Sequence, residues 1–502
     1  MALFVALILS LTASYVISST IYHLFFHPLS STPGPFLCRI STLPSFYHAC
    51  KGDRHVWIWQ NHQKYGDTFR AAPNLVLFRS PRAYNDVHGI RANVTRSDFY
   101  KAWQRNPRDI HTVCATDPKQ HATKRKLLNL VFTEQSLKAA SPLVVSHIDR
   151  WIRLLSRDTE DDGWSPPRNM STCVDQLVFD ILGDLCFGQS FVAIGYKLSK
   201  SPLLDLILFL QPRGLNKLME RARKKAITEY NRFIEGSVDA RIAAYKSGDS
   251  FSGRQDMFHF LLSAVDPDTN LPAFSDRDNL LSETRLLVLA GTDTTALVLT
   301  AIFFYLAHYP RVLSKLAAEV RITFDSADDI VLGSKLSGCR YLRACVDEAL
   351  RLAPPAPGEL PREVLPGGAI IDGHAYPAGT VVGCAGWAMG RDSSVYDDPD
   401  IYRPERWLAN SATDVLKLKK AFHPFSIGSM NCAGQDLAML ELLLVTARIV
   451  WATELRLAPG LTVGEGRKEL GWGQQDPMQY IMKDSYLCIK DGPYLQFKPR
   501  VF

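Results

Sequence analysis

One long apolar segment, 275–308, constrains the fold more than any other part of the chain. It begins with Ser275 followed by charged residues, a pattern typical of a helix N-terminus, and Pro310 follows its end. A helix of this length would run about 50 Å, whereas an average helix has about 11–12 residues. A helix so long and so apolar must cross the core of a large domain.

The middle of this segment, 286–295, changes abruptly from apolar to polar residues. Gly291 and the threonines that follow it are poor helix formers, and such local departures are expected where a functional site is built. The alternative is a structural kink bonded by Ser and Thr hydroxyls. The segment alone leaves both interpretations open.

The amino-terminal segment carries no Asp, Glu, Lys or Arg before Arg39. As a helix, residues 2–26 would span roughly 37 Å, enough for a bilayer core of about 30 Å. A cleaved signal peptide is the alternative, but a basic start and a small-residue cleavage pattern are missing. We therefore predict a transmembrane anchor over 1–26, a stiff, extended proline-rich connector over 27–38, and one large domain over 39–502.

Composition excludes several classes of protein. Of the 502 residues, 46% are hydrophobic and 22% are charged, which excludes bulk disorder, and the mean hydropathy of −0.05 excludes a multi-span membrane protein. A net charge of +6 is too mild to indicate nucleic-acid binding. The ten cysteines are scattered without a CxxC pair, so a disulfide framework is not expected. Basic residues follow the apolar segment and none precedes it, which favours a cytosolic domain.

The rest of the chain predicts a mainly α fold with small β-sheets. Helical periodicity is clearest at 134–156, 171–187, 217–245, 310–324, 338–352 and 433–451. Short strand patterns occur at 75–79, 368–371 and 380–384, and near 453–458 and 484–498.

The segment 425–434 places one cysteine, Cys432, where a helix is predicted to start. The positive end of a helix stabilises a thiolate. Gly428 permits a tight turn, Gly434 lets a large flat group approach the backbone, and Phe425 can shield the sulfur. Most lone cysteines are simply buried, so this interpretation needs partners elsewhere in the chain.

Such partners are present. Glu348 and Arg351 lie three residues apart on one helix face, where they can pair, and Arg406 lies in the segment 402–407. Each alone would usually be a surface ion pair. Together and in this order, these motifs resemble the cytochrome P450 family, in which the three charged residues form a structural triad behind the haem. The resemblance covers about residues 30–500.

The resemblance implies a cytochrome P450 fold, a single large haem domain preceded by one transmembrane helix, with haem b as the cofactor. Cys432 would be the axial ligand of the haem iron, and thiolate ligation favours cleavage of the O–O bond. Phe425, Gly428 and Gly434 would help to bind the cofactor.

The resemblance also implies which residues meet the haem propionates. His121 and Arg125 share one helix face and, with Arg362, would contact these carboxylates. Met430 departs from the family, which usually has a basic residue there, and Gly390 stands where the family often has His. We still expect haem binding, because the cysteine and its glycines match.

Two further sets of residues follow from the resemblance. Asp293 would relay protons from solvent, and the Thr294 hydroxyl would hold the bound oxygen and ordered water while protons arrive. The substrate pocket should be apolar, and its expected residues are Phe99, Leu286, Leu289, Ala290 and Glu359. Glu359 is the one charge expected there, and we expect it to face solvent; the alternative is contact with a polar or basic group of the substrate. The segment 203–225 reads either as a membrane-dipping apolar patch with a basic rim or as an ordinary amphipathic helix.

These features predict an oxidoreductase, a monooxygenase that inserts one atom of O2 into a hydrophobic small molecule. The stretch 65–74 is similar to fungal members of the family, which favours a secondary metabolite such as a terpenoid, polyketide or alkaloid. Electrons would come from NADPH through a separate NADPH–cytochrome P450 reductase, docked on a basic patch of Lys119, Lys124, Lys126, Lys417, Lys419 and Lys420. We expect a monomer at the endoplasmic reticulum membrane, single-pass, with its haem domain facing the cytosol.

Two alternatives remain at the level of sequence. One is a family member that rearranges a peroxide without a reductase, and the other is a non-catalytic haem sensor. Neither needs the acid–alcohol pair Asp293 and Thr294, which is intact here.

Overall fold

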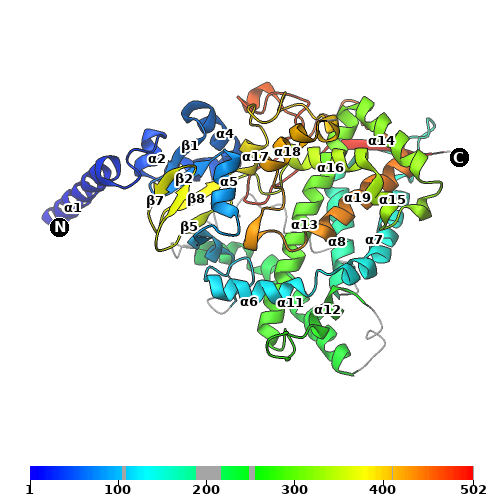
Figure 1. The fold of residues 1–502 in the computed structure, drawn as a ribbon, viewed down its shortest axis with the longest axis horizontal. Helices are drawn as coiled ribbons and strands as arrows, with labels where there is room; N and C mark the ends of the chain where they lie inside the picture. Colours follow the sequence, from blue (N-terminus) through cyan, green and yellow to red (C-terminus); the bar gives the residue numbers. More distant parts are fainter. Residues whose placement is uncertain (105–108, 188–215, 248–254, 410, 501–502) are drawn as a thin grey trace.

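The central helix α13 (Arg277–His308) organises the fold of the computed structural model, which describes residues 1–104, 109–187, 216–247, 255–409 and 411–500. It runs unbroken through the body of the protein (Figure 1), and most of its side chains are buried. Asp276, one residue later than predicted, caps its N-terminus by accepting hydrogen bonds from the backbone of Asp278 and Asn279. A Cβ on Gly291 would lie 2.8 Å from Leu182 Cδ1, so glycine lets a neighbouring helix pack closely.

The other long helices surround α13 and confirm the mainly helical prediction. Their bounds are α7 (Glu134–Leu155), α8 (Met170–Phe187), α11 (Asn216–Ser247), α14 (Pro310–Thr323), α16 (Arg340–Leu352) and α19 (Gln435–Ala452). Shorter helices are α2 (Phe36–Ile40), α3 (Leu43–Lys51), α4 (Arg54–Tyr65), α5 (Pro81–His88), α6 (Pro118–Asn129), α12 (Met257–Ser263), α15 (Ser334–Gly338), α17 (Gly386–Met389) and α18 (Ala412–Ala421). Buried side chains of α7, α8, α13, α14, α16 and α19 form the main hydrophobic core.

The strands form small sheets, the largest of which lies on the left of the body in Figure 1. The largest has the order β1 (Thr68–Ala72), β2 (Leu75–Phe78), β8 (Val381–Cys384), β5 (Arg362–Val364), β3 (Val94–Arg96). A three-stranded sheet joins β4 (Arg168–Asn169), β10 (Tyr494–Pro499) and β9 (Thr453–Leu457), and β6 (Ala369–Ile371) pairs with β7 (His374–Tyr376). The antiparallel pairing of β3 with β5 sets Arg96 directly opposite Arg362.

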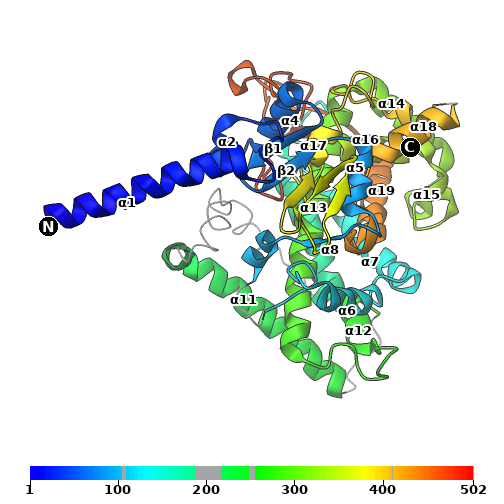
Figure 2. The ribbon, with the colours of Figure 1, turned by 60° about the vertical axis from the view of Figure 1, so that its left-hand side comes forward.

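The amino-terminal helix α1 (Ala2–Ile21) continues as a π-helical turn, η1 (Tyr22–Phe26), and projects away from the body of the protein (Figures 1 and 2). Within the described residues, two helices are long and apolar enough to cross a membrane. The stretch Leu3–Phe26 is 0% buried, whereas Arg277–His308 is 67% buried and is the core helix. The first is consistent with the predicted anchor.

The predicted extended connector over 27–38 is wrong in conformation. Residues 28–31 form turns, and α2 already begins at Phe36. The cause is Arg70, whose buried guanidinium donates hydrogen bonds to the carbonyls of His23 and Leu29 at 2.9 and 3.2 Å. Leu29 is buried as a result, so the connector packs onto the domain rather than standing away from it.

All ten cysteines are free thiols, which agrees with the expected lack of a disulfide framework. The predicted apolar patch with a basic rim lies largely outside the described residues, because its apolar part, 203–210, is not among them.

Candidate active site

A largely apolar cavity of about 370 Å³ lies between α13, α16, α6 and the loop that precedes α19. Leu286, Leu289, Ala290 and Thr294 of α13 form one wall, as the sequence predicted for the pocket, and Cys432 lies on the opposite side. The volume falls within the range of roughly 300–1,000 Å³ that is usual for small-molecule sites. The described lining residues carry several cations, and Glu441 is the only carboxylate among them.

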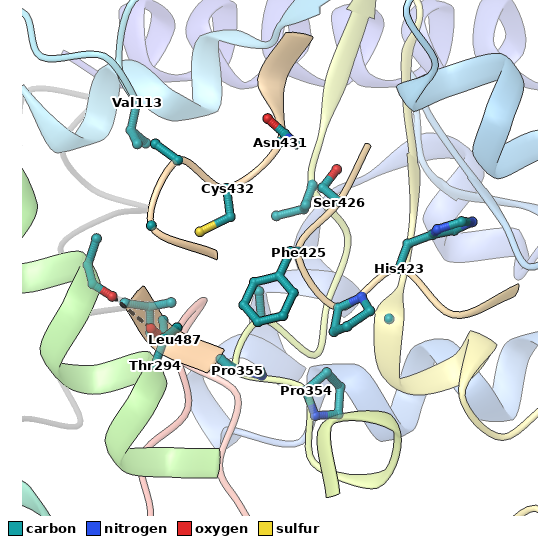
Figure 3. A pocket seen from close by; sticks show the side chains of 18 of the residues that line it. Val113, Thr294, Pro354, Pro355, His423, Phe425, Ser426, Asn431, Cys432 and Leu487 are labelled. Atoms are coloured by element: carbon teal, nitrogen blue, oxygen red, sulfur yellow. Dashed lines mark hydrogen bonds between the residues drawn. The ribbon is translucent and has the colours of Figure 1, made fainter. Parts of the chain in front are cut away.

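The loop before α19 presents the Cys432 sulfur to this cavity. The Cys432 backbone N–H donates to the Phe425 carbonyl at 2.8 Å, which closes the loop. Gly428 has φ +74°, and a Cβ there would lie 2.3 Å from the His88 carbonyl oxygen, so the turn requires glycine. Figure 3 shows the sulfur and the Phe425 ring turned toward the same space, with Thr294 on its far side.

The environment of Cys432 does not by itself favour a free thiolate. Burial raises the pKa of the thiol, whereas the backbone N–H of Gly434 and the nearby Arg125 act in the opposite direction. A cation bound at the sulfur would reverse this balance, because metal coordination deprotonates a thiol.

A cluster of buried basic groups lies beside the cavity. Arg96 and Arg362 face each other across β3 and β5, and both are buried. Like charges opposite each other in a sheet are unfavourable without a counter-charge. His121 is also buried, and its Nε2 has no hydrogen-bond partner in the described part of the chain. Burial, and then the nearby arginines, lower the pKa of His121 to about 3. The cluster is built to receive an anion.

Glu348 is the centre of a buried hydrogen-bond network on α16. It accepts from Arg351 Nε and Nη2 at 2.9 and 2.8 Å, from Arg406 Nε at 2.9 Å, from Trp407 Nε1 at 2.9 Å, and from the Arg403 backbone at 3.0 Å. Burial alone would raise the pKa of Glu348, but the arginines outweigh it and hold the pKa below its usual value. The expected triad is therefore assembled, and Trp407 and the Arg403 backbone extend it.

Asp293 and Thr294 lie together on α13. Burial raises the pKa of Asp293 to about 6, while Lys490 acts in the opposite direction. Lys490 forms an ion pair with Asp175, so Asp293 lies near a charged pair that is itself partly buried. The Thr294 hydroxyl donates to the Ala290 carbonyl at 2.8 Å and faces the cavity. A carboxyl with such a pKa can both take up and release a proton near neutral pH.

Comparison with known proteins decides the family. A model described as Cytochrome P450 matches residues 31–465. The chain belongs to the cytochrome P450 family. It is 32% identical to "Cytochrome P450 monooxygenase AKT7" of Alternaria alternata, over 97% of this chain and 96% of that protein. It is 34% identical to "Cytochrome P450 monooxygenase poxM" of Penicillium oxalicum, over 98% and 94%. As a P450 monooxygenase it is an oxidoreductase, and its family implies haem iron, O2, a small-molecule substrate and a redox partner.

The cavity fits the haem that the P450 family binds. The Cys432 sulfur faces it from one side, and the basic cluster, to which the described residues offer no acidic partner, suits the two propionate carboxylates. Arg96 is the member of this cluster that the sequence did not reveal. In the sequence, Arg96 is only a charged residue at the end of a short strand, a pattern too common to indicate a site. The pairing of β3 with β5 is what places it opposite Arg362.

Arg125 was expected to contact a haem propionate, but its guanidinium is hydrogen-bonded to residues of the protein. It donates to the Asn431 backbone carbonyl, to Asn431 Oδ1 at 2.7 Å, and to Asn129 Oδ1 at 2.8 Å. Arg125 is therefore bound to the P450 cysteine loop, at Asn431, the residue before Cys432. Met430 lines the cavity and contributes no charge where most P450 proteins have a base.

Gly390, the second departure from the P450 pattern, has a structural reason. A Cβ at this position would lie 2.5 Å from the Arg351 carbonyl oxygen, and the Gly390 carbonyl accepts a hydrogen bond from Arg351 Nη1. Close approach of the two backbones therefore requires glycine here.

Glu441 on α19 is a candidate that the sequence analysis missed. It is buried, it lines the P450 cavity, and it bonds to Thr295, the neighbour of Thr294. Its Oε1 has no hydrogen-bond partner within the described residues, and burial raises the pKa of Glu441 to about 8. The sequence signal was an acid on an otherwise apolar helix face.

Two predicted pocket residues lie behind the cavity wall. Glu359 is only 8% exposed, so the expectation that it faces solvent is wrong. The reason is Arg54, which binds both of its carboxylate oxygens at 2.5 and 2.6 Å. Phe99 is not among the described lining residues, and its ring packs on Tyr100 and Tyr486, which do line the cavity.

The predicted basic patch is smaller than expected. Lys124 turns inward to Glu283 and Asn279, and Lys126 pairs with Asp266 and Asp268. Both are therefore engaged within the chain, whereas the four other lysines of the patch, Lys119, Lys417, Lys419 and Lys420, are exposed.

Proposed function

We propose that this chain inserts one oxygen atom of O2 into a C–H or C=C bond of a hydrophobic small molecule, while the other oxygen atom leaves as water. The reaction consumes two electrons and two protons. The observation that carries the proposal is that Cys432, Thr294, Arg96 and Arg362 line one largely apolar cavity. Asp293 precedes Thr294 on α13, and His121 lies near the two arginines.

Each residue has a defined role in this proposal. Cys432 would ligate the iron, and the bound haem supplies the oxygen-activating redox chemistry. Arg96, Arg362 and His121 would hold the propionates through charge-assisted hydrogen bonds. Burial and the nearby arginines lower the pKa of His121, and an anionic propionate beside it would raise that pKa, so that the imidazole could take up a proton from solvent.

Asp293 and Thr294 would deliver protons. Asp293 would take a proton from the side of Lys490 and Asp175, which its pKa of about 6 allows near neutral pH. The Thr294 hydroxyl donates its hydrogen to the Ala290 carbonyl, so the lone pairs on Oγ1 remain available to accept a hydrogen bond from water inside the cavity.

The substrate would be a fungal secondary metabolite of terpenoid, polyketide or alkaloid type. The apolar α13 wall formed by Leu286, Leu289 and Ala290 supports a hydrophobic substrate, and the fungal relatives support the setting.

Electrons would come from NADPH through a separate reductase. The exposed lysines Lys119, Lys417, Lys419 and Lys420 would dock its acidic surface. The projecting helix Leu3–Phe26 supports a single-pass anchor in the endoplasmic reticulum membrane, with the domain in the cytosol beside the reductase.

Reconstituted turnover tests this proposal. The full chain, haem-loaded in lipid with a fungal reductase, should consume NADPH and O2 when a bound substrate is found by its spectral shift across a metabolite panel. Thr294→Ala should keep NADPH consumption but release peroxide in place of most product, and Thr294→Ser should restore coupling. Full coupling in Thr294→Ala would refute the proton-delivery role.

A further inference from the structure

Thr112, in the loop between the 3-10 helix η2 (Asp98–Trp103) and α6, is held at each of its polar atoms. Its backbone N–H donates to Glu283 Oε1 at 2.9 Å, and its hydroxyl donates to Glu283 Oε2 at 2.9 Å. Its carbonyl accepts from Arg96 Nη1 at 2.8 Å. Thr112 is buried, so these bonds are sheltered from competing water.

Glu283 is the centre of this arrangement. It projects from α13 about two turns before Ala290, and it is 1% exposed. A buried carboxylate is costly unless it is paired, and Lys124 of α6 lies 3.3 Å from Oε1. Lys124 also bonds Asn279, one turn earlier on α13. Glu283 therefore joins α13, α6 and the loop that contains Thr112.

This loop is part of the cavity wall. Thr112 and the next residue, Val113, both line the cavity that Cys432 also lines, and Figure 3 labels Val113 and Cys432 among the lining side chains. A second contact supports the same loop, because Ser282 of α13 donates to Asp109 Oδ1 at 2.6 Å. The position of Val113 thus depends on a carboxylate that lies outside the cavity lining.

We propose that Glu283 is a positioning residue that fixes the Thr112–Val113 wall through its paired oxygens and so determines the size of substrate that the cavity admits. Lys124 has the supporting role of holding the Glu283 carboxylate in place. The structural role of Glu283 in holding the Thr112–Val113 wall is independent of the proposed function. The effect of this wall on substrate size rests on the proposed function.

Hydrogen–deuterium exchange of the full, haem-loaded chain tests the wall. Glu283→Gln leaves one acceptor oxygen and turns an NH2 group toward other donors, so exchange in residues 109–117 should become about tenfold faster. Thr112→Val removes only the hydroxyl bond and should give a smaller increase in the same peptide. Lys124→Met, which removes the lysine that holds the Glu283 carboxylate, should also speed exchange in this peptide. Lys126→Met is its matched control and should not, because Lys126 lies on the same helix but pairs with Asp266 and Asp268. Unchanged exchange in both Glu283→Gln and Thr112→Val would overturn the proposal.

Ligand size tests the consequence. We expect Glu283→Gln to improve binding of ketoconazole relative to imidazole by about tenfold, measured by spectral titration of the haem. An unchanged ratio together with faster loop exchange would overturn the link to selectivity. Because neither readout needs turnover, a failure of this inference is distinguishable from a failure of the monooxygenase proposal.

Discussion

The guanidinium of Arg125 on α6 binds both the backbone carbonyl and the side-chain oxygen of Asn431, the residue before Cys432. This contact joins α6 to the cysteine loop across a sequence separation of 306 residues. It also places a cation beside the sulfur, where it lowers the pKa of the Cys432 thiol against the effect of burial. The loop thus has a nearby positive charge although Met430 supplies none.

Restoring the missing base should strengthen haem retention. Met430 lines the cavity, so Met430→Arg would add a donor for a propionate. We expect the rate of haem transfer to excess apomyoglobin to fall about tenfold, in line with one charge-assisted hydrogen bond. Met430→Leu is the control and should transfer haem as the parent does. Equal rates for Met430→Arg and the parent would contradict this account of the departure.

Breaking the Glu348 network should destabilise the protein. Glu348→Gln leaves two buried arginines without their counter-charge, which typically costs about 3–5 kcal/mol. Urea denaturation followed by circular dichroism should show this loss as a lower midpoint. Glu134→Gln, an exposed acid paired with Lys138, should change the midpoint little. A Glu348→Gln midpoint equal to that of Glu134→Gln would argue against the structural role.

The site could be predicted where its signals are local in sequence. The cysteine loop, the pair Glu348 and Arg351 and the helix 275–308 each carry their pattern within one segment. Arg96 and Arg362 meet only because β3 pairs with β5 in one register, and a single sequence does not specify that register. The inward turn of Lys124 and the pairing of Glu359 with Arg54 likewise depend on contacts between distant elements. Long-range partners of charged residues were therefore the part that sequence alone could not provide.

The stability of the protein should depend on pH through Glu441. Its pKa is raised by burial from 4.5 to about 8, so the folded state keeps its proton while the unfolded state loses it. Its contribution is fully present below pH 4.5 and is lost as pH rises to about 8. Glu441→Gln should remove this dependence and raise the free energy of unfolding at pH 8, on the order of 3 kcal/mol. Urea midpoints at pH 5 and pH 8 measure this dependence in the parent and in Glu441→Gln. If the midpoint falls between pH 5 and pH 8 by the same amount in both, the assignment is contradicted.

Electron transfer should depend on the exposed lysines of α18. Reversing Lys417, Lys419 and Lys420 to Glu should lower the association rate with the reductase by at least tenfold at low salt, and the difference should shrink as salt screens the charges. Stopped-flow reduction of the haem measures this rate. The same three reversals at Lys138, Lys335 and Lys468, exposed lysines on other elements, match the change in net charge. Equal rates for the two triple variants would exclude α18 as the docking surface.

The ligation of haem iron by Cys432 is the central claim, and the carbon monoxide difference spectrum of the reduced protein tests it most directly. The parent protein should give the thiolate-type band, and Cys432→His, which supplies a different ligand, should bind haem without that band. Cys384→Ala, which removes a second cysteine that lines the cavity, should keep it. A thiolate-type band that persists in Cys432→His would contradict the account.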